Sequence, residues 1–331
     1  MQRIKQHYVP RCYLKWFSPD GGSLHTYDKK ISKKYQASMM AVCCMDNLYT
    51  ISDKFVAKNN AAASDSTVNR LTIEHDFFSK TVEPNLDLLL RQIDEIREEW
   101  STGKEYYVIN DREKLEISLH LVSLYFRHPL LMESTVDNSI RAERASIDMM
   151  KMALASQTGD DGFNELQIGL EYDKPALSAS QTYMNEELLM DFAKAISKNI
   201  FVFWMSKDND FYTSDFPIVV SPHEENVRPM YMGLAQYGGE VMFTLSPGLA
   251  LSIYDREYFK PDENLDGHFI MADAKEIRRH NMTHYFYAQR HVFSLKNDFS
   301  LIEFIYQYNK GEHIFMAPNY KMSIVSGTGT Y

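Results

Sequence analysis

The apolar pattern of this chain changes from helical to strand-like near residue 200, and this change restricts the folds that the chain can adopt. Between residues 65 and 200, apolar side chains recur at intervals of three and four, most regularly over 84–100. From residue 201 onward they form short runs separated by turns, with one more helical stretch over 274–290. Separate helical and strand regions are typical of the α+β class. We therefore predict an α+β fold with a mixed or antiparallel C-terminal sheet and a late helix.

The first 60 residues show a third pattern. A turn sequence at 18–22, Ser-Pro-Asp-Gly-Gly, precedes short strand-like segments at 23–27, 35–40 and 48–51. These segments predict a small N-terminal β element. No internal repeat and no clear linker divides the 331 residues. We therefore expect a single domain with three regions, namely 1–60, 65–200 and 201–325.

Two consecutive helices are expected at the start of the helical region, over 67–82 and 84–100. Pro84 suits the first turn of the second helix. Glu74 and Glu83 lie nine residues apart, which is about two and a half turns of an α-helix. We therefore expect these two carboxylates on different sides of a straight helix and not as a functional pair.

The chain lacks the signals of a membrane or secreted protein. No apolar run approaches the roughly 20 residues that span a bilayer, and no apolar stretch of a signal peptide follows the first residues. The three cysteines, Cys12, Cys43 and Cys44, have no C-x-x-C spacing, which argues against a disulfide framework or a zinc ribbon. These features predict a cytoplasmic protein without a membrane partner.

Residues 6–18 combine charged and aromatic side chains around a single proline. His7 has an ordinary pKa near neutrality and is a candidate general acid or base, whereas Arg11 can hold a phosphate or carboxylate through two parallel hydrogen bonds. Tyr13 and Trp16 offer aromatic surfaces for stacking. We predict that this segment grips a ligand. The alternative is that His7 and Arg11 tie the segment to buried carbonyls and carboxylates.

Charge is distributed unevenly along the chain. The net charge is −10, yet residues 1–34 hold eight Lys or Arg against two Asp, a local charge of +6, which leaves −16 for the rest. A basic arm on an acidic body favours phosphate or an acidic partner. The alternative is a solvated basic face, or an arm that pairs with its own body. The overall charge argues against extended binding to duplex nucleic acid.

Three further residues are candidates for the same site. Asp215 follows Ser214 in a turn between two strand-like segments. Its carboxylate can bind backbone amides nearby, or it can be presented at the end of a strand, where sites often lie. Arg127 precedes the helix-ending Pro129, so it can cap helix carbonyls or join Arg11 around an anion. We predict ligand contact for Ser214 and Arg127.

Metal and nucleotide motifs are absent or incomplete. His280 and His284 have the spacing of zinc ligands on a helix, but the glutamate that serves as general base in that motif is missing. Ligand spacing therefore does not support a metal site, and the need for a divalent metal or another cofactor is unknown. The sequence contains no phosphate-binding loop, no dinucleotide fingerprint and no serine-hydrolase elbow.

Five short motifs occur in order along the chain. They are His7-x-Val9-Pro10-x-x-Tyr13-Leu14-x-x-Phe17, Asn47-Leu48-Tyr49, Phe126-Arg127-His128-Pro129, Thr213-Ser214-Asp215-Phe216-Pro217 and Phe243-Thr244-Leu245-Ser246-Pro247. Together they resemble a bacterial family described as domain of unknown function 4238. The family usually has proline where this chain has Thr244, at a strand end. The resemblance carries no established activity, but it implies a sporadically distributed accessory protein with a role in phage defence or genetic conflict.

Two functions remain open at this stage. The first is hydrolysis of a phosphodiester in nucleic acid or a nucleotide, with Arg11 and Arg127 on the phosphate, His7 moving the proton and Asp215 orienting His7 or holding a metal. The second is a binding module that recognises a nucleotide, peptide or phage component and acts with a partner protein. We expect the N-terminal segment, Arg127 and the Asp215 turn to converge on one polar cleft.

Overall fold

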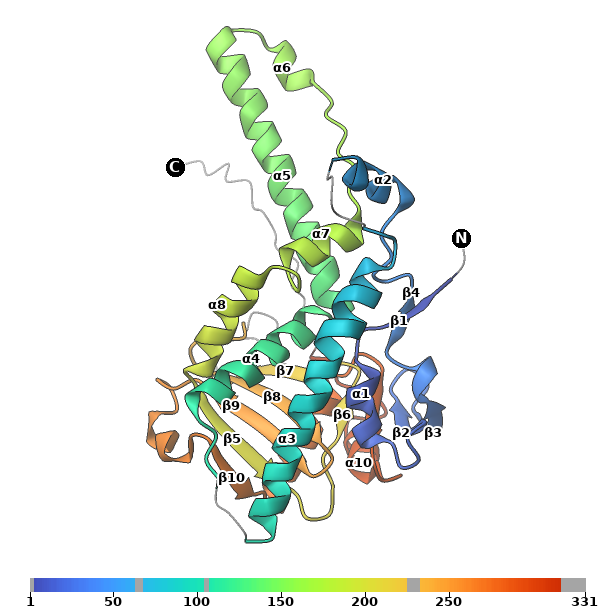
Figure 1. Cartoon of the computed structure of the whole chain (residues 1–331), viewed down its shortest axis with the longest axis vertical. Helices are drawn as coiled ribbons and strands as arrows, with labels where there is room; N and C mark the ends of the chain where they lie inside the picture. The colour runs from blue at the N-terminus through green and yellow to red at the C-terminus, as the bar shows by residue number, and fades with distance from the viewer. Residues whose placement is uncertain (1–2, 63–67, 104–106, 225–232, 317–331) are drawn as a thin grey trace.

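The structure is a computed structural model that describes residues 3–62, 68–103, 107–224 and 233–316. It has the predicted α+β fold, with a small N-terminal β element, a helical middle and a C-terminal mixed sheet (Figure 1). The last part of the predicted 201–325 region lies outside the described residues. None of the helices in the described residues is long and apolar enough to cross a membrane.

The C-terminal sheet has five strands in the order β10-β5-β9-β8-β7. Strand β10 pairs in parallel with β5, and the other pairs are antiparallel, so the sheet is mixed. Every residue of β8 is buried, which explains why this part of the sequence shows apolar runs and little alternation. The strands are β5 (Ile200–Met205), β7 (Ile218–Pro222), β8 (Gly239–Ser246), β9 (Leu249–Tyr254) and β10 (His268–Met271).

The N-terminal β element shares a sheet with the C-terminal part of the chain. Strand β11 joins the N-terminal hairpin on one side and β6 on the other, in the order β3-β2-β11-β6. A second, two-stranded sheet pairs β1 with β4. The strands are β1 (Lys5–His7), β2 (Ser23–Asp28), β3 (Lys33–Ser38), β4 (Cys44–Asp46), β6 (Thr213–Ser214) and β11 (His291–Ser294). Strands β2 and β11, which lie far apart in the sequence, are therefore neighbours in one hydrogen-bonded sheet.

Three helices lie across one face of the five-stranded sheet, namely α3 (Glu83–Ser101), α4 (Asp111–Phe126) and α8 (Glu186–Ser197) (Figure 1). Helix α4 begins with a capping box, in which the Asn110 side chain accepts from the backbone of Glu113 and the Glu113 side chain accepts from the backbone of Asn110. Buried aromatic and aliphatic side chains of the helices and the sheet form one core. This core holds the ends of α3 and α4 close to the N-terminal segment.

The segment Ile73–Val82, labelled η3, is a π-helix that runs without a break into α3. The Glu83 amide donates to the carbonyl of Phe78, five residues earlier, which is the π-type spacing. The prediction of two separate helices over 67–82 and 84–100 was therefore wrong about the break and about the helix type. The expected start at residue 67 lies outside the described residues.

Helix α5 (Pro129–Thr158) extends well beyond the body of the molecule (Figure 1). Gly159 ends it with a left-handed φ of 71°.

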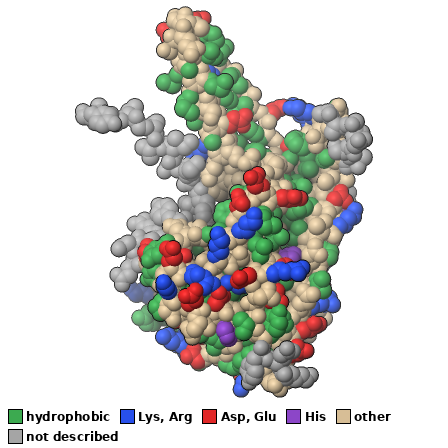
Figure 2. All heavy atoms as spheres, turned by 60° about the vertical axis from the view of Figure 1, so that its left-hand side comes forward, with side chains coloured by type: hydrophobic (Ala, Val, Ile, Leu, Met, Phe, Trp, Pro, Cys, Tyr) green, Lys and Arg blue, Asp and Glu red, His purple; other side chains and the backbone are tan. Residues whose placement is uncertain are grey.

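On the face shown in Figure 2, acidic and basic side chains are interspersed over the body. The remaining helices are α1 (Arg11–Leu14), η1 (Lys15–Phe17), η2 (Met39–Ala41), α2 (Asp53–Ala62), α6 (Gly162–Glu165), α7 (Lys174–Gln181), η5 (Lys260–Leu265), α9 (Ala274–Tyr287) and α10 (Ser300–Tyr308).

Candidate functional site

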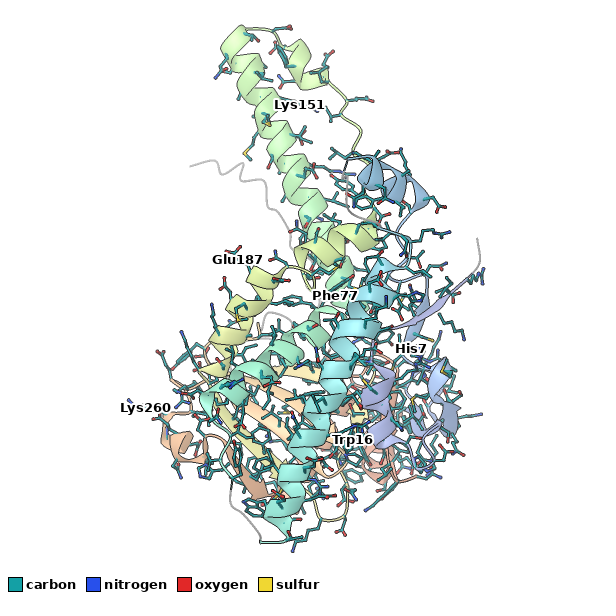
Figure 3. All side chains as sticks on the ribbon, in the orientation of Figure 1. His7, Trp16, Phe77, Lys151, Glu187 and Lys260 are labelled. Atoms are coloured by element: carbon teal, nitrogen blue, oxygen red, sulfur yellow. The ribbon has the colours of Figure 1, made fainter. Side chains whose placement is uncertain are left out.

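A polar hollow of about 330 Å³ lies where β1 and α1 meet the π-helix η3 and the start of α3. Two of the residues singled out in the N-terminal segment, His7 and Arg11, contribute to its wall. Figure 3 shows His7 beside α1, at the edge of the helical layer. The residues that line the hollow, which we call the His7 hollow, are Lys5, His7, Arg11, Met40, Glu74, Ser79 and Glu83.

Arg127, at the C-terminal end of α4, does not line the His7 hollow but binds two residues that do, His7 and Glu83. Its side chain is 1% exposed. Nη2 donates to the carbonyl oxygen of His7 at 2.6 Å and forms an ion pair with Glu83 Oε1 at 2.8 Å. The guanidinium carbon lies 4.0 Å from the centre of the Phe78 ring, an attractive cation–π distance. Arg127 therefore connects β1, the π-helix and α3 in one buried contact.

The π-helix brings Glu74 and Glu83 to the same hollow, so the prediction that they lie on different sides was wrong. A helix with i to i+5 hydrogen bonds has roughly 4.4 residues per turn, and nine residues then make about two whole turns. The prediction assumed an α-helix, in which nine residues make about two and a half turns. Sequence reasoning missed Glu74 as a site residue because nothing in the local pattern signals the π form.

Burial moves the pKa values of His7 and Glu74 in opposite directions. Desolvation lowers the pKa of His7, and the positive charges of Arg11 and Arg127 add to this effect, although the Met39 carbonyl opposes it. His7 Nε2 lies 3.3 Å from that carbonyl and must donate to it, so the neutral ring carries its lone pair on Nδ1. Desolvation raises the pKa of Glu74. The two pKa values therefore move toward each other, from 6.5 downward for His7 and from 4.5 upward for Glu74, which favours the coexistence of a neutral imidazole and a protonated carboxyl.

The His7 hollow contains two cations without an ion pair among the described residues, Lys5 and Arg11. The exposed Arg11 side chain donates a hydrogen bond from Nη1 to the sulfur of Met40 at 3.0 Å. Glu83, by contrast, is paired with Arg127. Glu74 Oε2 and Arg127 Nη1 are buried and have no hydrogen-bond partner in the part of the chain that the structure describes. The hollow therefore offers two cations without an ion pair and the unsatisfied Glu74 Oε2 to a ligand.

The other predicted site residues lie outside the lining of the His7 hollow. The Tyr13 hydroxyl is buried and donates to the carbonyl of Thr244 at 2.7 Å. Ser214 Oγ accepts from the amide of Phe216 at 3.1 Å and donates to the carbonyl of the same residue at 2.9 Å. These are contacts within the fold, and they fix the turn that contains Asp215.

Asp215 is fully engaged with the backbone at the end of α9. Its carboxylate accepts from the amides of Gln289, Arg290 and His291 at 2.8 to 2.9 Å, and the residue is 1% exposed. Desolvation raises the pKa of Asp215 to about 6 in spite of these three donors. The carboxylate joins the start of β11 to the turn after β6. The structural alternative considered for this residue was a bond to amides of its own turn, whereas these three donors lie 74 to 76 residues further along the chain.

The two histidines with zinc-like spacing are both buried. His284 Nε2 lies 2.8 Å from Thr244 Oγ1, and His280 Nε2 lies 3.1 Å from Ser252 Oγ and 3.2 Å from Glu276 Oε1. Within residues 3–62, 68–103, 107–224 and 233–316 there is no group of three or more His, Cys, Asp or Glu side chains placed to hold a metal ion.

The order and spacing of the motifs around this site match one family profile over residues 5–298, described as "Protein of unknown function (DUF4238)". The chain belongs to this family. The matched range includes every residue that lines the His7 hollow, together with Arg127 and Asp215. Comparisons with curated proteins and with solved structures gave no match.

Proposed function

We propose that the His7 hollow hydrolyses a phosphodiester in a nucleotide or in nucleic acid. The observation that carries this proposal is the meeting of His7 and Glu74, whose pKa values are shifted in opposite directions, with two unpaired cations in one small hollow. A neutral imidazole can take a proton from water, and a carboxyl with a raised pKa can supply one. Fixed cations stabilise the charge that develops on a phosphoryl group.

The reaction follows from these roles. A water oxygen attacks phosphorus while His7 Nδ1 takes one of the water protons. The bond between phosphorus and the leaving oxygen breaks, and the protonated Glu74 gives its proton to that oxygen. The products are a phosphate monoester and an alcohol, so atoms and charge balance. Lys5 and Arg11 neutralise the non-bridging oxygens.

Arg127 acts in this proposal as a positioning residue, because its contacts are with His7, Glu83 and Phe78 inside the wall. The proposal assigns Tyr13, Ser214 and Asp215 to the shape of the neighbouring fold, since their polar atoms bind the chain itself. This differs from the catalytic role that the sequence suggested for Asp215.

The test uses two diesters that differ in leaving group, a dinucleotide and bis(p-nitrophenyl) phosphate, each assayed with and without divalent ions. We expect His7→Ala to lower kcat/KM on both substrates by roughly 10²- to 10⁴-fold, the usual contribution of a general base. Glu74→Gln should lower it strongly only on the dinucleotide, because nitrophenolate leaves without a proton. The exposed neighbour His75 provides the control, since His75→Ala should retain activity. Turnover of the dinucleotide at the normal rate by His7→Ala would contradict the proposal.

The pH dependence of kcat/KM on the dinucleotide is expected to be bell-shaped. Activity rises as pH increases through the pKa of His7, because the base must be neutral, and falls as pH increases through the pKa of Glu74, because the acid must be protonated. Burial lowers the first pKa from its ordinary 6.5 and raises the second from 4.5, so the maximum lies on the acidic side of neutrality. Glu74→Gln should lose the alkaline limb. An alkaline limb that persists in this variant would rule out Glu74 as the acid.

A second candidate function is a sensor that binds a ligand in the same hollow and reports to a partner protein. The observation that favours it is the projecting part of α5, where Met149, Met150 and Met152 are exposed (Figure 1), as in adaptable protein-binding surfaces. Tight binding of a nucleotide with no turnover by the native chain would favour this candidate. For either function we propose a role in phage defence or genetic conflict, in line with the family resemblance.

A further inference from the structure

A second hollow of about 400 Å³ lies next to the His7 hollow along the contact between α1 and α3. It is lined by Cys12, Lys15, Trp16, Asp87 and Arg91, and we call it the Trp16 hollow. Its position follows from the helices, because Lys15 comes four residues after Arg11, and Asp87 four residues after Glu83. On α3 this spacing is one α-helical turn, about 5.4 Å, and on the opposite wall Lys15 lies in η1, directly after α1.

Contacts between α1 and α3 support this continuity. Cys12 Sγ donates to the carbonyl of Glu83 at 3.7 Å, so a residue of the Trp16 hollow contacts a residue of the His7 hollow directly. Figure 3 shows His7 and Trp16 on the same side of the molecule, near the two ends of α1. A ligand longer than a single phosphate group can therefore reach from one hollow into the next.

The charges of the two hollows together favour an anion with more than one phosphate. Asp87 is paired with Arg91 at 2.7 Å, and Glu83 is paired with Arg127. Three cations, Lys5, Arg11 and Lys15, have no ion pair within the described part of the chain. Glu83 and Asp87 are thus compensated internally, and Glu74 is the one lining carboxylate without an ion pair among the described residues. The three cations along β1, α1 and η1 are left for the ligand.

Trp16 adds an aromatic surface to this row. Its side chain packs against the core and is only partly buried. Packing fixes the ring, so little conformational entropy is lost when a flat ligand stacks on it. Cations along a backbone together with an aromatic stacking surface are the usual combination for single-stranded nucleic acid.

We propose that the substrate of this site is a single-stranded oligonucleotide, with the scissile phosphodiester in the His7 hollow and the base of the adjacent nucleotide stacked on Trp16. This inference rests on the proposed function, whose substrate it specifies. The short row of three cations suits a few phosphates of one strand and is too small for the broad basic face that duplex binding requires. DNA and RNA share this chemistry, so both are included in the test.

The experiment measures binding and hydrolysis separately. Binding of fluorescent eight-nucleotide thymidine and uridine oligomers to the His7→Ala chain is measured with and without Trp16→Ala. We expect Trp16→Ala to weaken binding by roughly 5- to 150-fold, the range for loss of one base stack, and Trp16→Phe to restore most of it. The control is Tyr308→Ala, which removes an aromatic ring that is 84% exposed on α10 and should leave binding unchanged. The ratio of kcat/KM for the oligomer to that for bis(p-nitrophenyl) phosphate should fall in the Trp16→Ala variant of the otherwise native chain.

The outcomes separate this inference from the proposed function. Trp16-dependent binding of the oligomers without hydrolysis of any diester would support the single-strand site and reject the hydrolase. Hydrolysis of the small diester together with oligomer binding that does not depend on Trp16 would overturn the inference and leave the hydrolase intact. Binding of a mononucleotide as tight as that of the oligomers would also overturn it, because only the longer ligand fills both hollows.

Discussion

Replacing Arg127 with methionine is expected to lower the free energy of unfolding by roughly 3 kcal/mol. Breaking a buried ion pair typically costs 3–5 kcal/mol, because the remaining charge is left without a partner. We expect a loss at the lower end of this range because the Glu83 side chain is 23% exposed and therefore partly solvated. The loss also includes the bond to the His7 carbonyl and the stacking on Phe78. Urea denaturation followed by tryptophan fluorescence measures the change.

The matched control is the other arginine of the site. Arg11→Met should change the free energy of unfolding by no more than about 0.5 kcal/mol, the usual range for an exposed residue, while it lowers activity, because Arg11 faces the hollow and has one contact to a methionine sulfur. A double variant, Arg127→Met with Glu83→Gln, should recover part of the stability by removing the stranded charge. Equal destabilisation by Arg11→Met and Arg127→Met would contradict this division of roles.

Replacing Asp215 with alanine should destabilise the fold by roughly 3 kcal/mol or more. Three backbone amides, those of Gln289, Arg290 and His291, would lose an acceptor that is 1% exposed, and an unsatisfied buried donor costs about 1–3 kcal/mol. Desolvation of the carboxylate, which also raises the pKa of Asp215 to about 6, offsets part of the native gain. The expected loss of unfolding free energy is therefore near the lower end of the summed cost of the three amides.

Asp20 provides a control with the same chemistry in water. Its exposed carboxylate also accepts from two backbone amides, those of Gly22 and Ser23, but water can replace it there. Asp20→Ala should therefore shift the urea midpoint much less than Asp215→Ala. If Asp215→Ala instead folds as stably as the native chain and loses hydrolysis, the structural assignment fails and the catalytic role suggested by the sequence returns.

The α+β class and the positions of most helices could be predicted from local pattern alone. The helix predicted over 84–100 is α3, and the helical stretch predicted over 274–290 is α9. Periodicity succeeds here because each helix presents one apolar stripe to the sheet, and because residues such as Asn110 and Asn185 cap the helices locally. The N-terminal segment with His7 and Arg11 was also identified from its residue types, and both side chains line the candidate site.

Tertiary structure decided which carboxylates belong to the site and which do not. Glu74 reaches the His7 hollow only because residues 73–82 form a π-helix, a form that is rare and costs local hydrogen-bond geometry. Long-range contacts favour it here, since Arg127 stacks on Phe78 and pairs with Glu83. Likewise, the amides that bind Asp215 lie 74 to 76 residues further along the chain. Local sequence determines which segments become helices and strands, but which polar groups are buried together depends on contacts between segments that no local pattern records.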